Sequence, residues 1–302
     1  MAERVSRSAV SDPCAGTCGA GARLWPTLLS QPVPDTLPEA IFHVEGDIAV
    51  PTELARGPWS PHAQHGGAPS ALLAGVLERV DAGPPAFTVR LTIDLMRPVP
   101  LAPLRIVTRV VRPGKKLQIV DASLYDGDVE VARATALRLR ALDDELDAHW
   151  QVPEVAVLAP PSGTSAFPRM ESGQVGYWNA VEMSPIVGQL FVPGPAAVWF
   201  RLRVPVVAGE EPSPLQRVAA VADFGNGVGS GIDRSRLSFI NADVNITLHR
   251  LPVGEWVALD GVMFAEPSGI GVAETVLHDQ RGRIGRGVQT VILEELDGRV
   301  EL

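Results

Sequence analysis

Cysteine is almost absent from this chain of 302 residues, because the only two are Cys14 and Cys18, in a leader rich in Gly, Ala and Ser. Two cysteines cannot build the disulfide framework of a small secreted protein. One pair without a second Cys/His pair at zinc-finger spacing also leaves half of a tetrahedral metal shell empty. The leader has no continuous apolar run, so neither a secretory signal nor a membrane span is predicted. We therefore expect a soluble, cytoplasmic protein without a metal site.

Positive charge is also scarce. Lys and Arg number 26 against 35 Asp and Glu, which gives a formal net charge of -9. No concentrated basic patch is visible, and an acidic surface repels a phosphate backbone. Nucleic acid is therefore excluded as an expected partner.

Two motifs of common enzyme classes are incomplete. The glycine-rich stretch Gly225 to Gly231 lacks the preceding strand and following helix that a dinucleotide-binding loop needs. No Gly-x-Ser-x-Gly surrounds Ser230, so the nucleophile elbow of serine hydrolases is missing. A covalent serine mechanism is therefore disfavoured.

What the chain does have is enough apolar sequence for one large domain or two ordinary ones, with 46% hydrophobic and 20% charged residues. Residues 1–36 have the composition of a flexible leader. Residues 141–175 begin acidic and continue Pro-rich, as linkers do. These two changes in composition predict an N-terminal domain over residues 37–140 and a C-terminal domain over residues 176–302.

The sequence repeats itself across these two parts. Residues 88–126 can be laid on residues 241–279 without a gap, which places Arg97 on Arg250 and Asp126 on Asp279. The same overlay sets residues 64–74 opposite residues 213–223. The first copy carries the paired glycines and no carboxylate, whereas the second carries Asp223 and no paired glycines. This complementary loss indicates one composite site shared by two copies.

Each copy has the same expected elements. Apolar residues at helical spacing predict a helix over 68–81, and strict alternation predicts a strand over 87–95. Further strands are expected over 103–112, 116–126 and 129–140. The second copy is expected to repeat the order, with a helix over 213–223 and strands over 236–249, 255–265, 269–279 and 284–295. The fold class is therefore α+β, with a buried helix followed by an antiparallel meander, twice.

The motifs of this pattern resemble those of the double hot-dog acyl-CoA thioesterase II family, within the thioesterase-like superfamily. The resemblance covers about residues 37–296 and rests on His65-Gly66-Gly67, Ala222-Asp223-Phe224, Leu248-His249-Arg250 and Gly287-Val288-Gln289. It implies a tandem hot-dog fold in which a curled antiparallel sheet wraps the central helix of each copy. It also implies hydrolysis of acyl-CoA thioesters by a directly activated water, with no cofactor besides the CoA of the substrate.

The resemblance places the water-positioning residues of the family on Asp223, Asn241 and Gln289. Asn241 departs from the family pattern, because a Ser or Thr is expected at that position. An amide can still donate to water or accept from it, so the site is altered rather than abolished.

The chemistry of hydrolysis suggests a role for each candidate. Asp223 ends an apolar helix, where loss of solvent would raise its pKa and make it a better base. The backbone amides of Gly66, Gly67 and Ala68 begin a helix and could bind the oxyanion. His65 has Pro214 as its counterpart, which favours a role in shaping the helix entry.

Two alternatives remain open at this stage. A hot-dog enoyl-CoA hydratase would need an Asp and a His on one short segment, and Asp243 to His249 does not have the required spacing. An acyl-thioester-binding protein with weak or no turnover is consistent with Asn241. The acyl group and its carrier, CoA or protein-bound pantetheine, are not specified. A homo-oligomer is possible because uncovered sheet edges invite pairing.

Overall fold

The computed structural model describes residues 37–142, 157–165, 167, 174–232 and 236–295. The expected leader, with Cys14 and Cys18, lies outside these ranges. The first half contains β1 (Phe42–Glu45), β2 (Ile48–Pro51), a short 3-10 helix (Glu53–Ala55), α1 (Gly67–Arg79), β3 (Phe87–Asp94), β4 (Leu104–Arg112), β5 (Leu117–Asp126) and β6 (Val129–Leu139).

The second half repeats this order with small additions. It contains α2 (Tyr177–Ala180), β7 (Val181–Val187), β8 (Ala196–Leu202), α3 (Pro214–Ala222), a 3-10 turn (Asp223–Asn226), β9 (Leu237–Asn241), β10 (Asp243–Leu248), β11 (Val257–Ala265), β12 (Ile270–Asp279) and β13 (Gly282–Glu295). None of the helices in the described ranges is long and apolar enough to cross a membrane.

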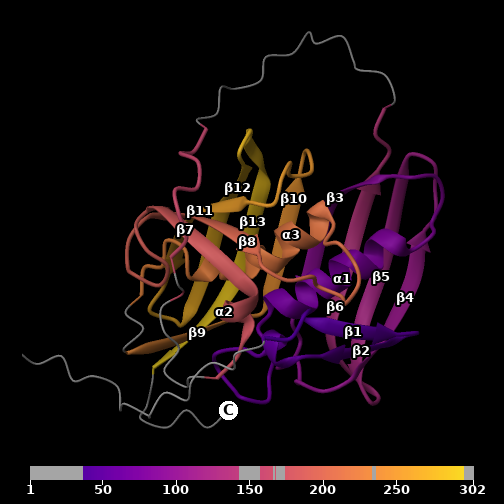
Figure 1. Cartoon of the computed structure of the whole chain (residues 1–302), viewed down its shortest axis with the longest axis horizontal. Coiled ribbons are helices and arrows are strands. Elements are labelled where there is room, and N and C mark those ends of the chain that lie inside the picture. Colours follow the sequence, from indigo (N-terminus) through magenta and orange to yellow (C-terminus); the bar gives the residue numbers. More distant parts are fainter. Residues whose placement is uncertain (1–36, 143–156, 166, 168–173, 233–235, 296–302) are drawn as a thin grey trace, which may run out of the picture.

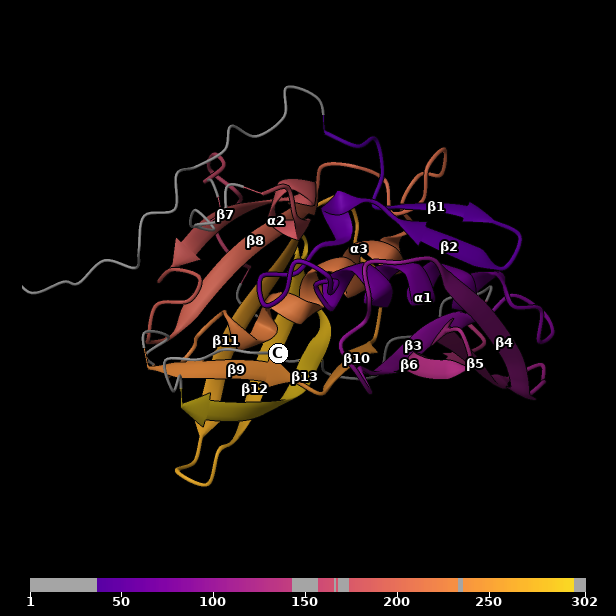
Figure 2. The ribbon, with the colours of Figure 1, turned by 90° about the horizontal axis from the view of Figure 1, so that it is seen from below.

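All strands belong to one large antiparallel sheet. Its order is β1-β2-β4-β5-β6-β3-β10-β13-β12-β11-β8-β7, and β9 pairs with β13. The first half of the chain forms one side of this sheet and the second half forms the other, with α1 and α3 between them (Figure 1). Figure 2 shows the sheet curling around these helices, so that β1 and β2 lie across α1 from β3 and β6.

The two long helices begin and pack in different ways. Ser213 caps α3 and forms a reciprocal capping box with Gln216, with Pro214 in the first turn. Helix α1 has no side-chain cap and is buried along its whole length from Gly67 to Leu77. A helix that is apolar on every side has to be enclosed. It packs against α3 so closely that a Cβ on Gly75 would lie 2.3 Å from Nε2 of Gln216.

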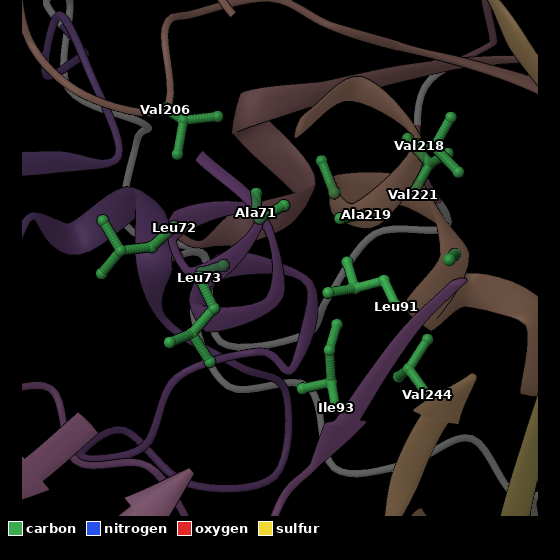
Figure 3. Close-up of a cluster of buried hydrophobic side chains, with 14 of the residues drawn as sticks. Ala71, Leu72, Leu73, Leu91, Ile93, Val206, Val218, Ala219, Val221 and Val244 are labelled. Atoms are coloured by element: carbon green, nitrogen blue, oxygen red, sulfur yellow. The ribbon is translucent and has the colours of Figure 1, made fainter. Parts of the chain in front are cut away.

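The main core lies between the helices and the two central strands. Leu91 and Ile93 of β3 and Val244 of β10 gather with side chains of α1 and α3 (Figure 3). Leu73 and Val218, from these two helices, are fully buried in the same cluster. Each such side chain contributes about 1.5–3 kcal/mol of hydrophobic free energy. One shared core therefore holds the two halves together.

The two halves meet through the same strand of each copy. β3 pairs with β10 in a register that places Thr92 directly opposite Asn245. These two residues are also counterparts in the sequence overlay, because they are separated by the same shift that sets Arg97 on Arg250. An antiparallel pair centred on equivalent residues has a local two-fold axis. The duplication in the sequence is therefore also a symmetry of the sheet.

Most expected elements are present, and one is wrong. Both long helices and the meander strands lie within about two residues of their expected bounds. The single strand expected over 236–249 is instead two strands separated at Ala242, because β9 pairs only with β13 whereas β10 pairs with both β13 and β3. Strands β1, β2, β7 and β8 were not expected.

Part of the segment expected to be a linker contacts the second half. Nε1 of Trp199 donates to the carbonyl of Ala159 at 2.8 Å, and Ser165 forms an isolated bridge with Met183 of β7. Residues 143–156 lie outside the described ranges. The domain boundaries therefore stay a prediction.

Candidate active site

Asp223 lies where α3 passes into a 3-10 turn, and its side chain is only 5% exposed. Gly225 in this turn allows the side chain of Gln289 to approach closely. A Cβ on Gly225 would lie 2.5 Å from Oε1 of Gln289. The end of α3 thus places a carboxylate in the interior, against the start of α1 from the other half.

Three predicted site residues surround this carboxylate. Nδ1 of His65 lies 2.9 Å from Oδ2 of Asp223, and Nδ2 of Asn241 donates to Oδ1 at 2.8 Å. Nε2 of Gln289 lies 3.5 Å from Oδ1 and 3.3 Å from the backbone oxygen of Asp223. Segments separated by more than 200 residues therefore meet at one acid.

The pKa of Asp223 is lower than its ordinary value, contrary to the direction expected from the sequence. Burial is the largest influence and raises the pKa. The charge on a protonated His65 and hydrogen bonds from His65, Asn241 and the amide of Gly67 together outweigh burial. Asp223 is therefore ionised at neutral pH, and it is a weaker base than expected.

His65 is held by aromatic rings. Its imidazole stacks on Tyr177 with ring centroids 4.6 Å apart, and Phe224 lies at 4.8 Å on a tilted plane. The hydroxyl of Tyr177 donates to the carbonyl of Ala220 at 2.8 Å, and burial followed by the charge of Asp223 raises the pKa of this phenol well above its usual value. These contacts fix the imidazole next to the carboxylate.

The paired glycines allow this approach. A Cβ on Gly66 would lie 2.7 Å from Oδ1 of Asp223, and one on Gly67 would lie 2.6 Å from the carbonyl oxygen of Ala220. Both distances are shorter than any ordinary carbon contact. Only glycine at these positions lets the start of α1 touch the end of α3.

Two of the three amides expected to bind an oxyanion already face protein atoms. The N–H of Gly67 lies 3.1 Å from Nδ1 of His65, and the N–H of Ala68 donates to the carbonyl of His65 at 3.0 Å. When Nδ1 carries the proton shared with Asp223, it cannot accept from Gly67, and that N–H then faces the carboxylate. Of the three, the amide of Gly66 has no hydrogen-bond partner among the described residues.

Gln289 offers an unused acceptor. Its side chain is 2% exposed, and Oε1 has no hydrogen-bond partner in the part of the chain that the structure describes. A buried amide oxygen without a partner is costly, unless a water or a ligand satisfies it. One polar atom beside Asp223 therefore lacks a hydrogen-bond partner among the described residues.

The sequence did not indicate two residues of the site. Tyr177 supports the imidazole, and Nδ2 of Asn226 donates to Oδ1 of Asn241 at 3.2 Å, which orients the amide group of Asn241. The only available signal was weak, since Tyr177 is one of two tyrosines in the chain and Asn226 closes the turn after Asp223. Among the described residues, no cluster of three or more His, Cys, Asp or Glu side chains could hold a metal ion.

Each half of the chain matches a family model. Residues 55–139 match the family model described as the acyl-CoA thioesterase N-terminal domain, and residues 151–293 match the acyl-CoA thioesterase C-terminal domain. The chain belongs to the acyl-CoA thioesterase family. It is therefore a thioester hydrolase by family, and acyl-CoA is the substrate class of that family. No curated protein sequence matches the chain.

Solved structures share the fold of this thioesterase at low sequence identity. A proposed thioesterase of Novosphingobium aromaticivorans is 19% identical with a TM-score of 0.64, over 84% of this chain and 98% of that one. A hot-dog-fold protein of unknown function from Alicyclobacillus acidocaldarius is 14% identical with a TM-score of 0.62, over 85% and 97%. The acyl-CoA thioesterase II TesB2 of Mycobacterium marinum is 15% identical with a TM-score of 0.59, over 85% and 95%.

Proposed function

We propose that this chain is a tandem double hot-dog enzyme that hydrolyses acyl-CoA thioesters with a water activated at Asp223. The observation that carries the proposal is the meeting of His65 and Gly66 from one half with Asp223 from the other. Neither half contains this constellation alone. A single site built from both halves would also explain why one copy lacks the carboxylate and the other lacks the paired glycines.

In the proposed reaction, the oxygen of a water attacks the thioester carbonyl carbon while Asp223 accepts a proton from that water. The tetrahedral intermediate collapses by breaking the C–S bond, and the departing sulfur takes up a proton as free thiol. The products are the carboxylic acid and CoA. General base assistance of this kind contributes about 10²- to 10⁴-fold in rate.

The neighbours of Asp223 have separate roles in this proposal. Asn241 donates to Oδ1 and fixes the carboxylate, whereas the free Oε1 of Gln289 accepts from the attacking water. In the proposal, the Gly66 amide at the start of α1 donates to the developing oxyanion, where a single donor is worth roughly 10²- to 10³-fold. His65 compensates the buried charge of Asp223 and, when neutral, presents its second nitrogen as an alternative proton acceptor.

The mechanism uses side chains and backbone groups of the chain itself. CoA enters only as part of the substrate, and no separate cofactor takes part in any step. The scarcity of cysteine supports a cytoplasmic location. Protein-bound pantetheine offers the same thioester and is the alternative carrier.

The decisive experiment measures thiol release from acyl-CoAs of several chain lengths by wild type, Asp223→Asn and His65→Gln. We expect Asp223→Asn to lower kcat by about 10²-fold or more, because an amide cannot accept the proton. Asp126→Asn is the matched control, because Asp126 is exposed in the first half. Equal rates for wild type and Asp223→Asn would remove Asp223 from the mechanism.

The pH dependence of the same variants separates the two proton acceptors. Since the pKa of Asp223 is lowered, its protonation cannot account for a loss of activity near neutral pH. If the activity of wild type falls with pH near neutrality and the activity of His65→Gln does not, the imidazole is the proton acceptor. Hydration of crotonyl-CoA by wild type would favour the hydratase alternative, and tight acyl-CoA binding without thiol release would favour the binding protein.

A further inference from the structure

A second cavity lies at the opposite end of the paired helices. It has a volume of about 360 Å³, which falls in the range of roughly 300–1,000 Å³ typical of small-molecule sites. Its walls come from the end of α1, the segment that leads into β3, and single residues of β6 and of the loop after β10. None of its lining residues belongs to the active site described above.

This cavity is the two-fold counterpart of the active site. In the active site, Asn241 lies opposite Val291 in the sheet, beside the end of α3 and the start of α1. In the second cavity, Thr88 lies opposite Arg138, and both are shifted from those residues by the same interval as the sequence repeat. Here the end of α1 meets the start of α3, because Ser213 donates to Glu78.

Arg138 gives the second cavity a different chemistry. Its side chain lines the cavity but is only 6% exposed. Nη1 donates to the carbonyl of Val80 at 2.9 Å and reaches Oε1 of Gln118 at 3.4 Å. Nε and Nη2 are themselves buried and have no hydrogen-bond partner among the described residues, so a ligand reaches them only if the guanidinium turns this edge toward the cavity. A buried guanidinium with two unmet donors is strongly destabilising, unless something else satisfies them.

The two unmet donors define the ligand group. Nε–H and Nη2–H form one edge of the planar guanidinium, and this edge matches the two oxygens of a carboxylate or phosphate in a bidentate pair. Glu78 and Asp81 line the same cavity, and Glu78 already compensates part of the charge of Arg138. Their negative charge disfavours a dianion more than a monoanion. A monocarboxylate therefore fits better than a phosphate.

The remaining walls favour a hydrocarbon tail. Val80, Phe87 and Leu251 line the cavity together with Pro84 and Pro85. Apolar surface of this kind stabilises a bound hydrocarbon chain in proportion to the number of methylenes that it buries. The guanidinium of Arg138 and the apolar walls of the cavity thus both favour an amphipathic ligand.

We propose that this cavity is a second binding site, separate from the active site, for a monocarboxylic acid with an apolar tail, whose carboxylate pairs with Nε and Nη2 of Arg138. Free carboxylic acids are also the products of the proposed reaction. The proposal concerns binding alone, so its test does not depend on whether the proposed hydrolysis is correct.

The test is calorimetric titration of the full chain with octanoate, and with octanol and inorganic phosphate as probes that lack the charge or the tail. We expect saturable octanoate binding that is weakened about tenfold or more in Arg138→Gln, since the amide loses the charge-assisted hydrogen bonds to the carboxylate. Arg133→Gln is the matched control, because Arg133 lies on the same strand and pairs with Glu130 at the surface. It should bind octanoate like wild type.

A second variant keeps the test decisive if the loss of Arg138 disturbs folding. Ala86→Trp fills the cavity and leaves the guanidinium in place, so it should abolish octanoate binding while thioester hydrolysis stays within about twofold of wild type. Binding that Arg138→Gln and Ala86→Trp retain but Asp223→Asn loses belongs to the active site and overturns the proposal. Absence of octanoate binding, or phosphate binding of equal strength, overturns it as well.

Discussion

At Asp223, burial and polar neighbours act in opposite directions on one carboxylate. The position of this carboxylate beside the paired glycines could be predicted from the sequence, because the repeat showed a carboxylate in one copy and paired glycines in the other. Its protonation could not be predicted. That depends on His65, which approaches to 2.9 Å from more than 150 residues away. An expectation based on burial alone therefore has the wrong sign.

Substitutions of Asn241 show how much the site depends on the hydrogen bond that Asn241 donates to Asp223. Asn241→Ala removes the 2.8 Å hydrogen bond and should lower kcat about 10-fold or more, because the carboxylate loses its orientation. Asn241→Thr restores a hydroxyl and should match or exceed the wild-type rate. The measurement is the steady-state release of thiol from one acyl-CoA. An Asn241→Ala enzyme with full activity would contradict the role given to this amide.

At the scale of elements, predictability follows from periodicity. The helix expected over 68–81 is α1 (Gly67–Arg79), because apolar residues recur at helical spacing. Strand β8 was missed because its residues are apolar without alternation, and β7 because it contains Pro185. β1 and β2 have four residues each, too few for a pattern. The division of β9 from β10 depends on which strands they pair with, which the local sequence does not encode.

The contact between α1 and α3 makes Gly67 sensitive to a single methyl group. In Gly67→Ala, the new Cβ would lie 2.6 Å from the Ala220 oxygen and 2.8 Å from Cε1 of Tyr177, so the helices have to move apart. We expect a loss of about 1–3 kcal/mol in unfolding free energy and a fall of about 10²-fold in kcat. Urea unfolding and thiol release measure the two effects.

Gly231→Ala is the control for this substitution, because its Cβ would have its nearest contact at 3.4 Å. It should leave both quantities close to those of wild type. If Gly67→Ala behaved like Gly231→Ala, the close approach of the helices would not be needed for the site.

At the scale of the whole molecule, the two halves have diverged in how their equivalent residues are used. Arg250 and Asp279 form a bidentate ion pair in which Asp279 is fully buried. Their counterparts Arg97 and Asp126 are exposed, and no ion pair joins them in the described ranges. The outer edge of the first half contacts the second half, because the amide of Phe42 in β1 donates to the carbonyl of Val206 at 2.9 Å. The two halves therefore share a fold but are stabilised by different contacts.

Asp279→Asn should therefore destabilise the protein in a pH-dependent way. Burial raises the pKa of Asp279, but hydrogen bonds from Arg250 and from the amides of Val253 and Arg281 lower it overall. A lowered pKa contributes stability above the unfolded pKa, near 4, that is lost as the pH falls through the folded value. We expect Asp279→Asn to cost about 3 kcal/mol at pH 7 and progressively less below pH 4.

Urea unfolding at several pH values measures this effect, with Asp126→Asn as the counterpart from the first half. That control should change the unfolding free energy by less than about 0.5 kcal/mol, as exposed substitutions do. A pH-independent loss in Asp279→Asn would mean that packing rather than charge is responsible.

The register of β3 against β10 makes the assembly of the residues around Asp223 an all-or-none event. Strands that keep the same face buried can slide past each other only in steps of two residues, about 7 Å. Displacing the Thr92–Asn245 alignment by one such step would carry His65 far beyond hydrogen-bond range of Asp223. Partial misalignment is thus not available to this molecule. A chain that joins its halves correctly possesses the whole constellation, and one that slips possesses none of it.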